Sequence, residues 1–411
     1  MTKKPSFKIS LADIQEARNE LHQHLQPSPL LYNSWISELL KCKVYLKLEN
    51  MQPIGSFKIR GATYKISTLS PQEKKRGVVA ASAGNHAQGV AWGCKRLGVN
   101  ALIVMPKSAS LIKIQNTKAL GAKIHLEGDS FDDAMAAARK IARKSGRVFI
   151  HAFEDEKIIA GAGTVGLEIL DQLPEVDVLI GSIGGGGLMS GISIVFKELC
   201  PQVQIIGCQA SGAPSMVQSI KKGRAVHLES KSMDTFADGI AIASASSKVL
   251  SILAPRLDLI VEEDDEEIAA AVLMLLEKAK VLTEGSGALP LAALQKLAKK
   301  MRGKRVVLVI SGGNIDVNVL NRIIDRGLIR AGRRVRVNVQ ISDRPGSLAR
   351  LTELLAREGA SVIQAIHDRS EPSTMIDQTE VALTLETRGP EHSKTLIKAL
   401  RAHVLKLELA H

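Results

Sequence analysis

Aromatic residues are scarce in this sequence. Only 3% of the 411 residues are Phe, Trp or Tyr, whereas hydrophobic residues as a whole make up 45%. A buried core must therefore be built from Ala, Val, Ile and Leu, which suits helices packed on a parallel sheet. The length fits two or three domains rather than one.

Long hydrophobic runs and paired cysteines are also missing. No apolar run approaches the roughly 18–20 residues that a membrane helix needs, and the N-terminal segment MTKKPSFKIS has lysines with no apolar stretch after them. The four cysteines, Cys42, Cys94, Cys200 and Cys208, have the spacing of neither a zinc site nor a disulfide framework. We therefore expect no membrane partner, no secretory leader, no metal site and a reducing, cytoplasmic location.

The charge is basic but spread along the chain. Lys and Arg number 55 against 42 Asp and Glu, a net charge of +13, which raises the hypothesis of nucleic-acid binding. The densest basic cluster, residues 330–336, adjoins alternating valines and resembles the start of a strand. No basic stripe is interleaved with aromatic residues. We therefore expect no nucleic-acid partner.

Short apolar runs alternate with helical patterns over most of the chain. The helical patterns include the amphipathic segments 129–146 and 265–280. Strands separated by helices predict an α/β fold with mostly parallel, doubly wound sheets. The predicted strands are 44–49, 77–82, 100–105, 122–127, 147–152, 177–184, 203–209, 258–263 and 305–311.

The pattern changes near residue 333. From there the elements run in the order βαββαβ, which predicts a small ferredoxin-like domain. The segment 325–334 contains two glycines and is the predicted domain boundary.

A lysine follows a small-residue turn in GSFKIRGA (55–62). Lys58 opens a helical pattern and is flanked by Phe57 and Ile59. Partial desolvation at such a position would lower the pKa of the lysine and make its amine a nucleophile or Schiff-base former. Most lysines are solvated surface groups, so this motif alone does not decide between the two interpretations.

Four consecutive glycines, 184–187, lie between an apolar strand and a helical pattern in GSIGGGGLMSG (181–191). Glycine lets successive backbone amides turn toward an anion, and the start of a helix adds positive potential. This favours a phosphate-binding loop over an ordinary tight turn. It is not a P-loop, because GxxxxGK[ST] is absent.

A second glycine motif, GAGTVG (161–166), matches the pattern GxGxxG. It does not directly follow a strand, and no acidic residue lies roughly 20 positions on to bind a ribose. We interpret it as close helix packing. A nicotinamide-dependent oxidoreductase built on this motif is retained as an alternative.

Three further small-residue turns are SAGNHAQG (82–89), TEGSGA (283–288) and SGGN (311–314). The first and the last follow apolar strands directly, at the carboxyl ends where ligands bind in open α/β sheets. Each could be an ordinary turn. Together with the lysine and the phosphate loop, they predict a site for a phosphorylated aldehyde cofactor, and pyridoxal phosphate fits all of them.

Five motifs, SFKIRGA, SAGNHAQG, GGGGL, TEGSGA and SGGN, occur in this order. Together they closely resemble the fold-type II pyridoxal-phosphate enzymes, in particular the threonine ammonia-lyases (threonine dehydratases). The tail DRPGSLARLTELLAREGASVIQAIHDR resembles an ACT regulatory domain. The resemblance covers nearly the whole chain and implies a tryptophan-synthase-β-like catalytic region at 1–330, with a smaller lobe at roughly 50–150 inserted in the larger one, and an ACT domain at 331–411.

The resemblance also implies residue roles. Lys58 would bind the cofactor covalently and remove the Cα proton of the substrate, while Phe57 would pack against the cofactor ring. Asn85 would hydrogen-bond the 3′ oxygen of the ring, and Ser311 would face its pyridine nitrogen. The remaining implied contacts are Gly184, Gly185, Gly186, Gly187 and Leu188 for the phosphate, and Ser82, Ala83, Gly84, Asn85, His86 and Glu284 for the substrate.

The implied reaction is deamination of L-threonine to 2-oxobutanoate and ammonia, with L-serine as a second substrate. Serine dehydratases and serine racemases are the alternatives within the family. The racemases have a serine where this chain has Ala83, and Ala83 cannot transfer a proton. Their metal-binding carboxylates correspond here to Gln209, Ala213 and Ser215, which offer none to a hard cation. Both departures favour a lyase.

The tail also leads to predictions. Asp343, Pro345 and Gly346 shape a turn into a helix whose backbone amides could bind the carboxylate of an amino-acid effector. The resemblance implies allosteric regulation, a place in isoleucine biosynthesis, and a homo-oligomer, either dimer or tetramer. A non-catalytic amino-acid sensor built on this tail is the remaining alternative.

Overall fold

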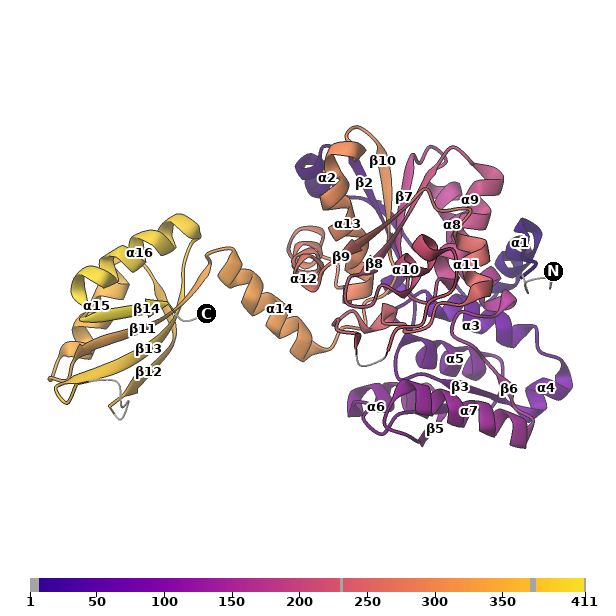
Figure 1. Cartoon of the computed structure of the whole chain (residues 1–411), viewed down its shortest axis with the longest axis horizontal. Helices are drawn as coiled ribbons and strands as arrows, with labels where there is room; N and C mark the ends of the chain where they lie inside the picture. Colours follow the sequence, from indigo (N-terminus) through magenta and orange to yellow (C-terminus); the bar gives the residue numbers. More distant parts are fainter. Residues whose placement is uncertain (1–6, 230–231, 370–374, 410–411) are drawn as a thin grey trace. The chain divides into compact units, whose positions relative to one another are not determined.

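The computed structural model describes residues 7–229, 232–369 and 375–409. The chain forms two compact units, one ending at Ile315 and the other starting at Asp316 (Figure 1). No helix within these ranges is long and apolar enough to cross a membrane.

The larger lobe of the first unit is built on a six-stranded sheet with the strand order β1-β2-β10-β7-β8-β9. All neighbouring strands are parallel except β1, which runs antiparallel to β2. Strands β7, β8 and β10 are buried over nearly their whole length, which explains their continuous apolar sequences. The strands are β1 (Leu30–Tyr32), β2 (Lys43–Leu48), β7 (Val178–Ser182), β8 (Gln204–Ala210), β9 (Leu259–Glu263) and β10 (Arg305–Ile310).

Helices pack against this sheet. Helices α1, α8 and α9 contact one another, and their apolar side chains share a core cluster with β7, β8 and β10. Helix α13 packs on β7, β8, β9 and β10. The helices of this lobe are α1 (Leu11–Leu21), α2 (Ser34–Leu40), α8 (Glu156–Gln172), α9 (Gly187–Leu199), α10 (Ser215–Lys222), α11 (Ser247–Leu253), α12 (Asp265–Met274) and α13 (Gly285–Met301), with the shorter turns η1 (Glu49–Met51), η3 (Asp238–Ile240) and η4 (Leu275–Ala279).

The smaller lobe is built on a four-stranded parallel sheet with the order β5-β4-β3-β6. Alternate residues of β3 enter two different cores: Val78 and Ala80 pack in the cluster that contains α5 side chains, and Val79 and Ala81 pack with the alanines of α7. The elements of this lobe are α3 (Lys58–Ser67), α4 (Pro71–Arg76), β3 (Val78–Ala81), α5 (Asn85–Arg96), β4 (Ala101–Met105), α6 (Leu111–Ala119), β5 (Lys123–Leu126), α7 (Phe131–Ser145) and β6 (Val148–Phe149).

All nine predicted strands are confirmed, with two differences. The run 147–152 forms only the two residues of β6, because the backbone N–H groups of Phe153 and Glu154 donate to His151 Nδ1, at 3.3 and 2.9 Å, and turn the chain. The short edge strand β1 was not predicted. It is only three residues long and directly follows a segment with two prolines.

The GAGTVG motif lies inside α8 and is buried. A Cβ atom added to Gly161 would lie 2.8 Å from the Cα of Gly61 in α3, and one added to Gly163 would lie 3.0 Å from the Cα of Gly191 in α9. The predicted close helix packing is therefore confirmed. Glycines in mid-helix against two neighbouring helices cannot form a dinucleotide-binding turn.

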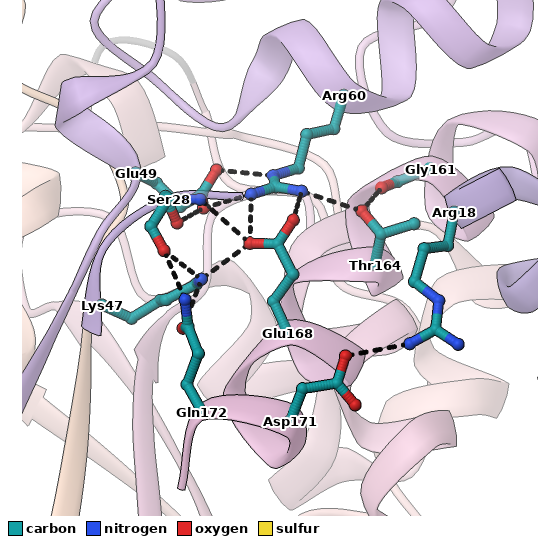
Figure 2. A network of polar contacts seen from close by, with 10 residues as sticks. All are labelled: Arg18, Ser28, Lys47, Glu49, Arg60, Gly161, Thr164, Glu168, Asp171 and Gln172. Carbon is teal, nitrogen blue, oxygen red and sulfur yellow. Dashed lines mark hydrogen bonds and ion pairs between the residues drawn. The ribbon is translucent and has the colours of Figure 1, made fainter. Parts of the chain in front are cut away.

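A buried ionic network joins α3 to β2, η1 and α8 (Figure 2). Arg60 donates to both carboxylate oxygens of Glu49, each at 2.7 Å, and to those of Glu168 at 2.6 and 2.8 Å. Lys47 Nζ donates to Glu168 Oε2 at 2.7 Å. The network holds two cations and two anions, so it is balanced in charge.

The second unit has a four-stranded antiparallel sheet with the order β12-β13-β11-β14. Its elements follow the predicted βαββαβ order after an additional helix, α14. Helix α14 groups with this unit, although the sequence placed residues 316–330 with the catalytic region; Asp325 of α14 pairs with Arg334 and Arg336 of β11. The elements are α14 (Val317–Arg330), β11 (Arg334–Ser342), α15 (Ser347–Arg357), β12 (Ser361–Asp368), β13 (Gln378–Glu386), α16 (Pro390–His403) and β14 (Lys406–Leu409).

Candidate active site

Two loops that are far apart in the sequence pair with each other beside Lys58. Ser56 and Gly312 form an antiparallel bridge. Phe57 N donates to the carbonyl of Ser311 at 3.0 Å, and Gly313 N donates to the carbonyl of Gly55 at 2.9 Å. This pairing joins the start of α3 to the carboxyl end of β10.

Lys58 is the first residue of α3. Its Nζ lies 3.3 Å from the carbonyl oxygen of Ala152 and 5.0 Å from the centre of the Phe57 ring. Burial lowers the pKa of Lys58 to about 8, although the nearby carboxylate of Glu284 acts in the opposite direction. The amine of Lys58 therefore loses its proton near pH 8, well below the range of an exposed lysine, and is nucleophilic when neutral.

The glycine loop connects β7 to α9. Gly186 has a φ of +84°, which favours glycine, and no side chain caps α9. A Cβ on Gly184 would lie 2.8 Å from the Cα of Ile240, and one on Gly185 would overlap the ring of Phe153. The first amides of a helix have no partner within it, so this tightly enclosed turn fits a bound phosphate.

Asn85 and Glu284 meet in the site although they are 199 residues apart in the sequence. The Nδ2 of Asn85 lies 2.9 and 3.1 Å from the two carboxylate oxygens of Glu284, and Ser286 Oγ donates to Oε1 at 2.5 Å. Glu284 is buried, and desolvation and the neighbouring Asp238 raise its pKa, while the hydrogen bonds from Ser286 and Asn85 partly oppose them.

The loop from Ser82 to His86 follows the carboxyl end of β3 and begins α5. Space is open around Gly84, since no atom lies within 4 Å of where a Cβ would be. His86 is buried, and its Nε2 lies 3.1 Å from the carbonyl of Ile150. Burial, and then the charge of Lys58, lower the pKa of His86 to about 3, so the imidazole is neutral and Nε2–H donates.

Ser311 is buried at the carboxyl end of β10. Its Oγ lies 3.4 Å from the carbonyl oxygen of Ser286, which also accepts a hydrogen bond from Ser182 Oγ at 2.5 Å. Ser311 is thus attached through the carbonyl of Ser286 to the start of α13, the helix that follows Glu284.

The structure brings some of the predicted residues of the first unit together, while Ser82, Ala83, Gly84, Gly184, Gly185 and Gly186 are not among those that line the pocket. Phe57, Lys58, His86, Gly187 and Leu188 line a single pocket together with Ala152, while Asn85, Glu284 and Ser311 are connected by the bonds described above. The predicted effector residues Asp343, Pro345 and Gly346 belong to the second unit, where Gly346 precedes α15 with a φ of +87°.

Several residues at the site were not assigned a role from the sequence, among them Ala152, Phe153 and Asn314. Ala152 and Phe153 follow β6 in a segment that carries no glycine motif. Asn314 ends the SGGN motif, which was the one available signal, but only its serine was used.

Gln209, Ala213 and Ser215, the positions singled out through the resemblance to serine racemases, carry no carboxylate. Gln209 Oε1 accepts from the backbone N–H groups of Met216 and Val217, at 3.1 and 3.0 Å, and so caps α10. Within the described ranges, no group of three His, Cys, Asp or Glu side chains could hold a metal ion.

A desolvated lysine that lines the same pocket as the glycine loop after β7 is the arrangement expected of enzymes that use a phosphorylated aldehyde cofactor. The family model of pyridoxal-phosphate dependent enzymes matches residues 21–312, and that of the ACT domain matches residues 335–404. The chain therefore belongs to the pyridoxal-phosphate dependent enzymes and carries an ACT domain.

Individual relatives agree with this. The chain is 47% identical over 395 residues to an L-threonine ammonia-lyase of Thermotoga maritima, covering 96% of this chain and 98% of that protein. The processed form of threonine deaminase isoform 2 from Solanum lycopersicum matches with a TM-score of 0.74 at 35% identity, over 78% of this chain and 90% of that one. Maize serine racemase matches with a TM-score of 0.74 at 31% identity, over 79% and 99%. The predicted fold, cofactor and lyase class are confirmed.

Proposed function

We propose that this enzyme converts L-threonine to 2-oxobutanoate and ammonia, and L-serine to pyruvate and ammonia. Elimination removes water across Cα and Cβ, and a later hydrolysis returns water as ammonia leaves. The observation that carries the proposal is the convergence of Lys58, the glycine loop and the Asn85–Glu284 pair in a chain related over nearly its whole length to an L-threonine ammonia-lyase.

Pyridoxal phosphate, when bound, supplies an electron sink that makes the Cα–H bond of an amino acid acidic. The residues present fit this group. The amides of Gly184 to Leu188 would hold the phosphate, and Phe57 and Asn85 would contact the ring. Ser311 would offer a neutral hydroxyl to the ring nitrogen.

Lys58 is the residue proposed to bind the cofactor covalently and to move the Cα proton. With a pKa of about 8, its amine can both give up and take a proton near neutral pH. Glu284 accepts a hydrogen bond from Asn85, and burial raises its pKa. We assign it to the substrate side of the site, with the Ser82–His86 loop binding the substrate carboxylate.

Serine racemisation is the second candidate, because the fold matches a serine racemase as well as a threonine deaminase. Two features favour the lyase. Ala83 offers no hydroxyl for a second proton transfer. Gln209, at a position where the resemblance implies a metal-binding carboxylate in the racemases, instead accepts hydrogen bonds from the start of α10.

The ACT domain supports a proposal of allosteric control by an amino acid. Asp343, Pro345 and Gly346 would form the effector turn at the start of α15, whose N-cap Gly346 provides no capping side chain. We further propose a homo-oligomer that works in the cytoplasm in isoleucine biosynthesis. The four free cysteines are consistent with a reducing compartment.

The decisive experiment compares wild type with Lys58→Ala. Wild-type protein should release 2-oxobutanoate from L-threonine and show the visible absorption of a lysine-bound cofactor, whereas Lys58→Ala should lose both. Lys58→Ala turning over threonine at near the wild-type rate would disprove the assignment. Chiral analysis of serine in the same reactions tests the racemase alternative, which requires D-serine at a rate near that of elimination.

A further inference from the structure

Asn314 donates a hydrogen bond to Asn85, and the proposed function gives this bond no role. Its Nδ2 lies 2.7 Å from Asn85 Oδ1 and 2.8 Å from the backbone carbonyl oxygen of Ile54. Asn314 is an exposed residue, yet its side-chain nitrogen donates hydrogen bonds to both of these oxygens. It therefore connects the loop before Lys58 with the first residue of α5.

The orientation of both amides follows from chemistry. A backbone carbonyl can only accept, so the group of Asn314 that faces Ile54 must be its NH2. This NH2 also contacts Asn85, whose facing atom must then be the acceptor Oδ1. The NH2 of Asn85 consequently points the other way, toward Glu284.

The surrounding backbone fixes Asn314 in this place. The antiparallel pairing of residues 55–57 with 311–313 places Asn314 directly after the paired segment. Gly55, at a φ of +71°, leaves room for the amide, because a Cβ at Gly55 would lie 2.6 Å from Asn314 Oδ1.

We propose that Asn314 is a positioning residue that sets the amide of Asn85, so that Asn85 presents a hydrogen-bond donor to the ring oxygen of pyridoxal phosphate. The inference rests on the proposed function, which assigns Asn85 to the cofactor. A donor there stabilises the ionised ring oxygen, whereas a reversed amide would present a carbonyl and repel it.

The test variant is Asn314→Asp, which cannot donate to Asn85 and attracts the NH2 of Asn85 toward itself. Its matched control is Asn50→Asp. Asn50 also donates from Nδ2 to a backbone carbonyl, that of Leu282 at 2.9 Å, but has no bond to Asn85. The readouts are the dissociation constant of pyridoxal phosphate for the full-length apoprotein and the pKa at which the absorption of the bound cofactor changes.

Asn314→Asp should weaken cofactor binding roughly tenfold to hundredfold, the range for a hydrogen bond to a charged group, and should raise the absorption pKa. Asn50→Asp should leave both within about twofold of wild type. In an Asn85→Ala background, Asn314→Asp should change neither quantity, because its effect acts through Asn85.

Equal behaviour of Asn314→Asp and Asn50→Asp would overturn the inference, as would an effect that persists in the Asn85→Ala background. If Asn314→Asp fails to fold by circular dichroism, Asn314→Ala decides by the same comparisons, with a smaller change expected because Asn85 is then free to turn. Wild type that binds pyridoxal phosphate but releases no 2-oxobutanoate from threonine would instead disprove the proposed function and leave the role of Asn314 standing.

Discussion

Replacing Arg60 with methionine tests whether the buried ionic network stabilises the catalytic unit. Methionine keeps a long, flexible side chain but removes the guanidinium. Every N–H donor of Arg60 is used, since Nε contacts Glu49, Nη1 contacts Thr164 and Glu168, and Nη2 contacts both carboxylates. The variant leaves two buried carboxylates with Lys47 as the remaining cation of the network.

The expected loss is large because both carboxylates are out of water: Glu49 is 0% exposed and Glu168 is 5% exposed. Removing one partner of a buried ion pair costs about 3–5 kcal/mol of unfolding free energy. The matched control is Arg18→Met. Arg18 of α1 forms an ion pair at 3.1 Å with Asp171, which lies in α8 like Glu168 (Figure 2). The side chains of Arg18 and Asp171 are 28% and 65% exposed. Such a pair contributes about 0–1 kcal/mol.

Urea unfolding would measure the difference. The chain has two tryptophans; Trp35 lies in α2 of the larger lobe and Trp92 in α5 of the smaller lobe. Trp92 also packs against the core cluster of α1, α8 and α9, so single-tryptophan backgrounds report two different sites of the first unit. Coincident transitions at both sites would justify a two-state free energy. An Arg60→Met variant no less stable than Arg18→Met would refute the reasoning.

The loss of unfolding free energy in Arg60→Met should also depend on pH. In wild type, burial acts to raise the pKa of Glu168, but Arg60 and Lys47 outweigh it and hold this pKa below its usual value. That stabilisation is present above the unfolded pKa of about 4.3 and is lost as the pH falls. Without Arg60 the Glu168 carboxylate takes up a proton more readily, so the difference in unfolding free energy between wild type and Arg60→Met should narrow from pH 7 toward pH 5.

Three other predictions concern the cofactor site and the tail. Reconstitution of apoprotein with pyridoxal phosphate should accelerate about tenfold per pH unit below the Lys58 pKa of about 8 and then level off, because only the neutral amine attacks an aldehyde; a stopped-flow profile that still rises at pH 10 would contradict this. Gly185→Ala should weaken cofactor binding at least tenfold, because the added Cβ overlaps the Phe153 ring; equilibrium dialysis would measure it. Truncation after Ala331 should preserve threonine deamination but abolish an effector response of roughly 5–150-fold in apparent threonine affinity; full-length curves that no branched-chain amino acid changes would remove the regulatory proposal.

The parallel fold was predictable because strand and helix periodicities are local. Each buried strand of the two parallel sheets appears as a continuous apolar run, and Ser130 and Gly146 flank α7 as its N-cap and left-handed C-cap. The departures also have local causes. The His151 turn ends β6 early, and β1 is too short to show an alternating pattern.

The candidate site was predictable in its positions but not in its connections. Loops after β3, β7 and β10 had to lie at the carboxyl edges of their sheets, where ligands bind. The pairing of residues 55–57 with 311–313 depends on contacts across more than 250 residues, and no local pattern indicates it. Asn314, whose bond to Ile54 depends on this pairing, was therefore missed.

Arg60 and Lys58 show how one helix gives two basic residues opposite properties. Both lie in the first turn of α3. Burial would lower the pKa of either, but at Arg60 the carboxylates of Glu49 and Glu168 reverse this and keep the guanidinium charged. Lys58 has only the more distant Glu284 to oppose desolvation, so its pKa falls to about 8. Arg60 joins α3 to α8 through its ion pair with Glu168. Lys58 is not needed for this contact, so its amine can lose its proton and act as a nucleophile.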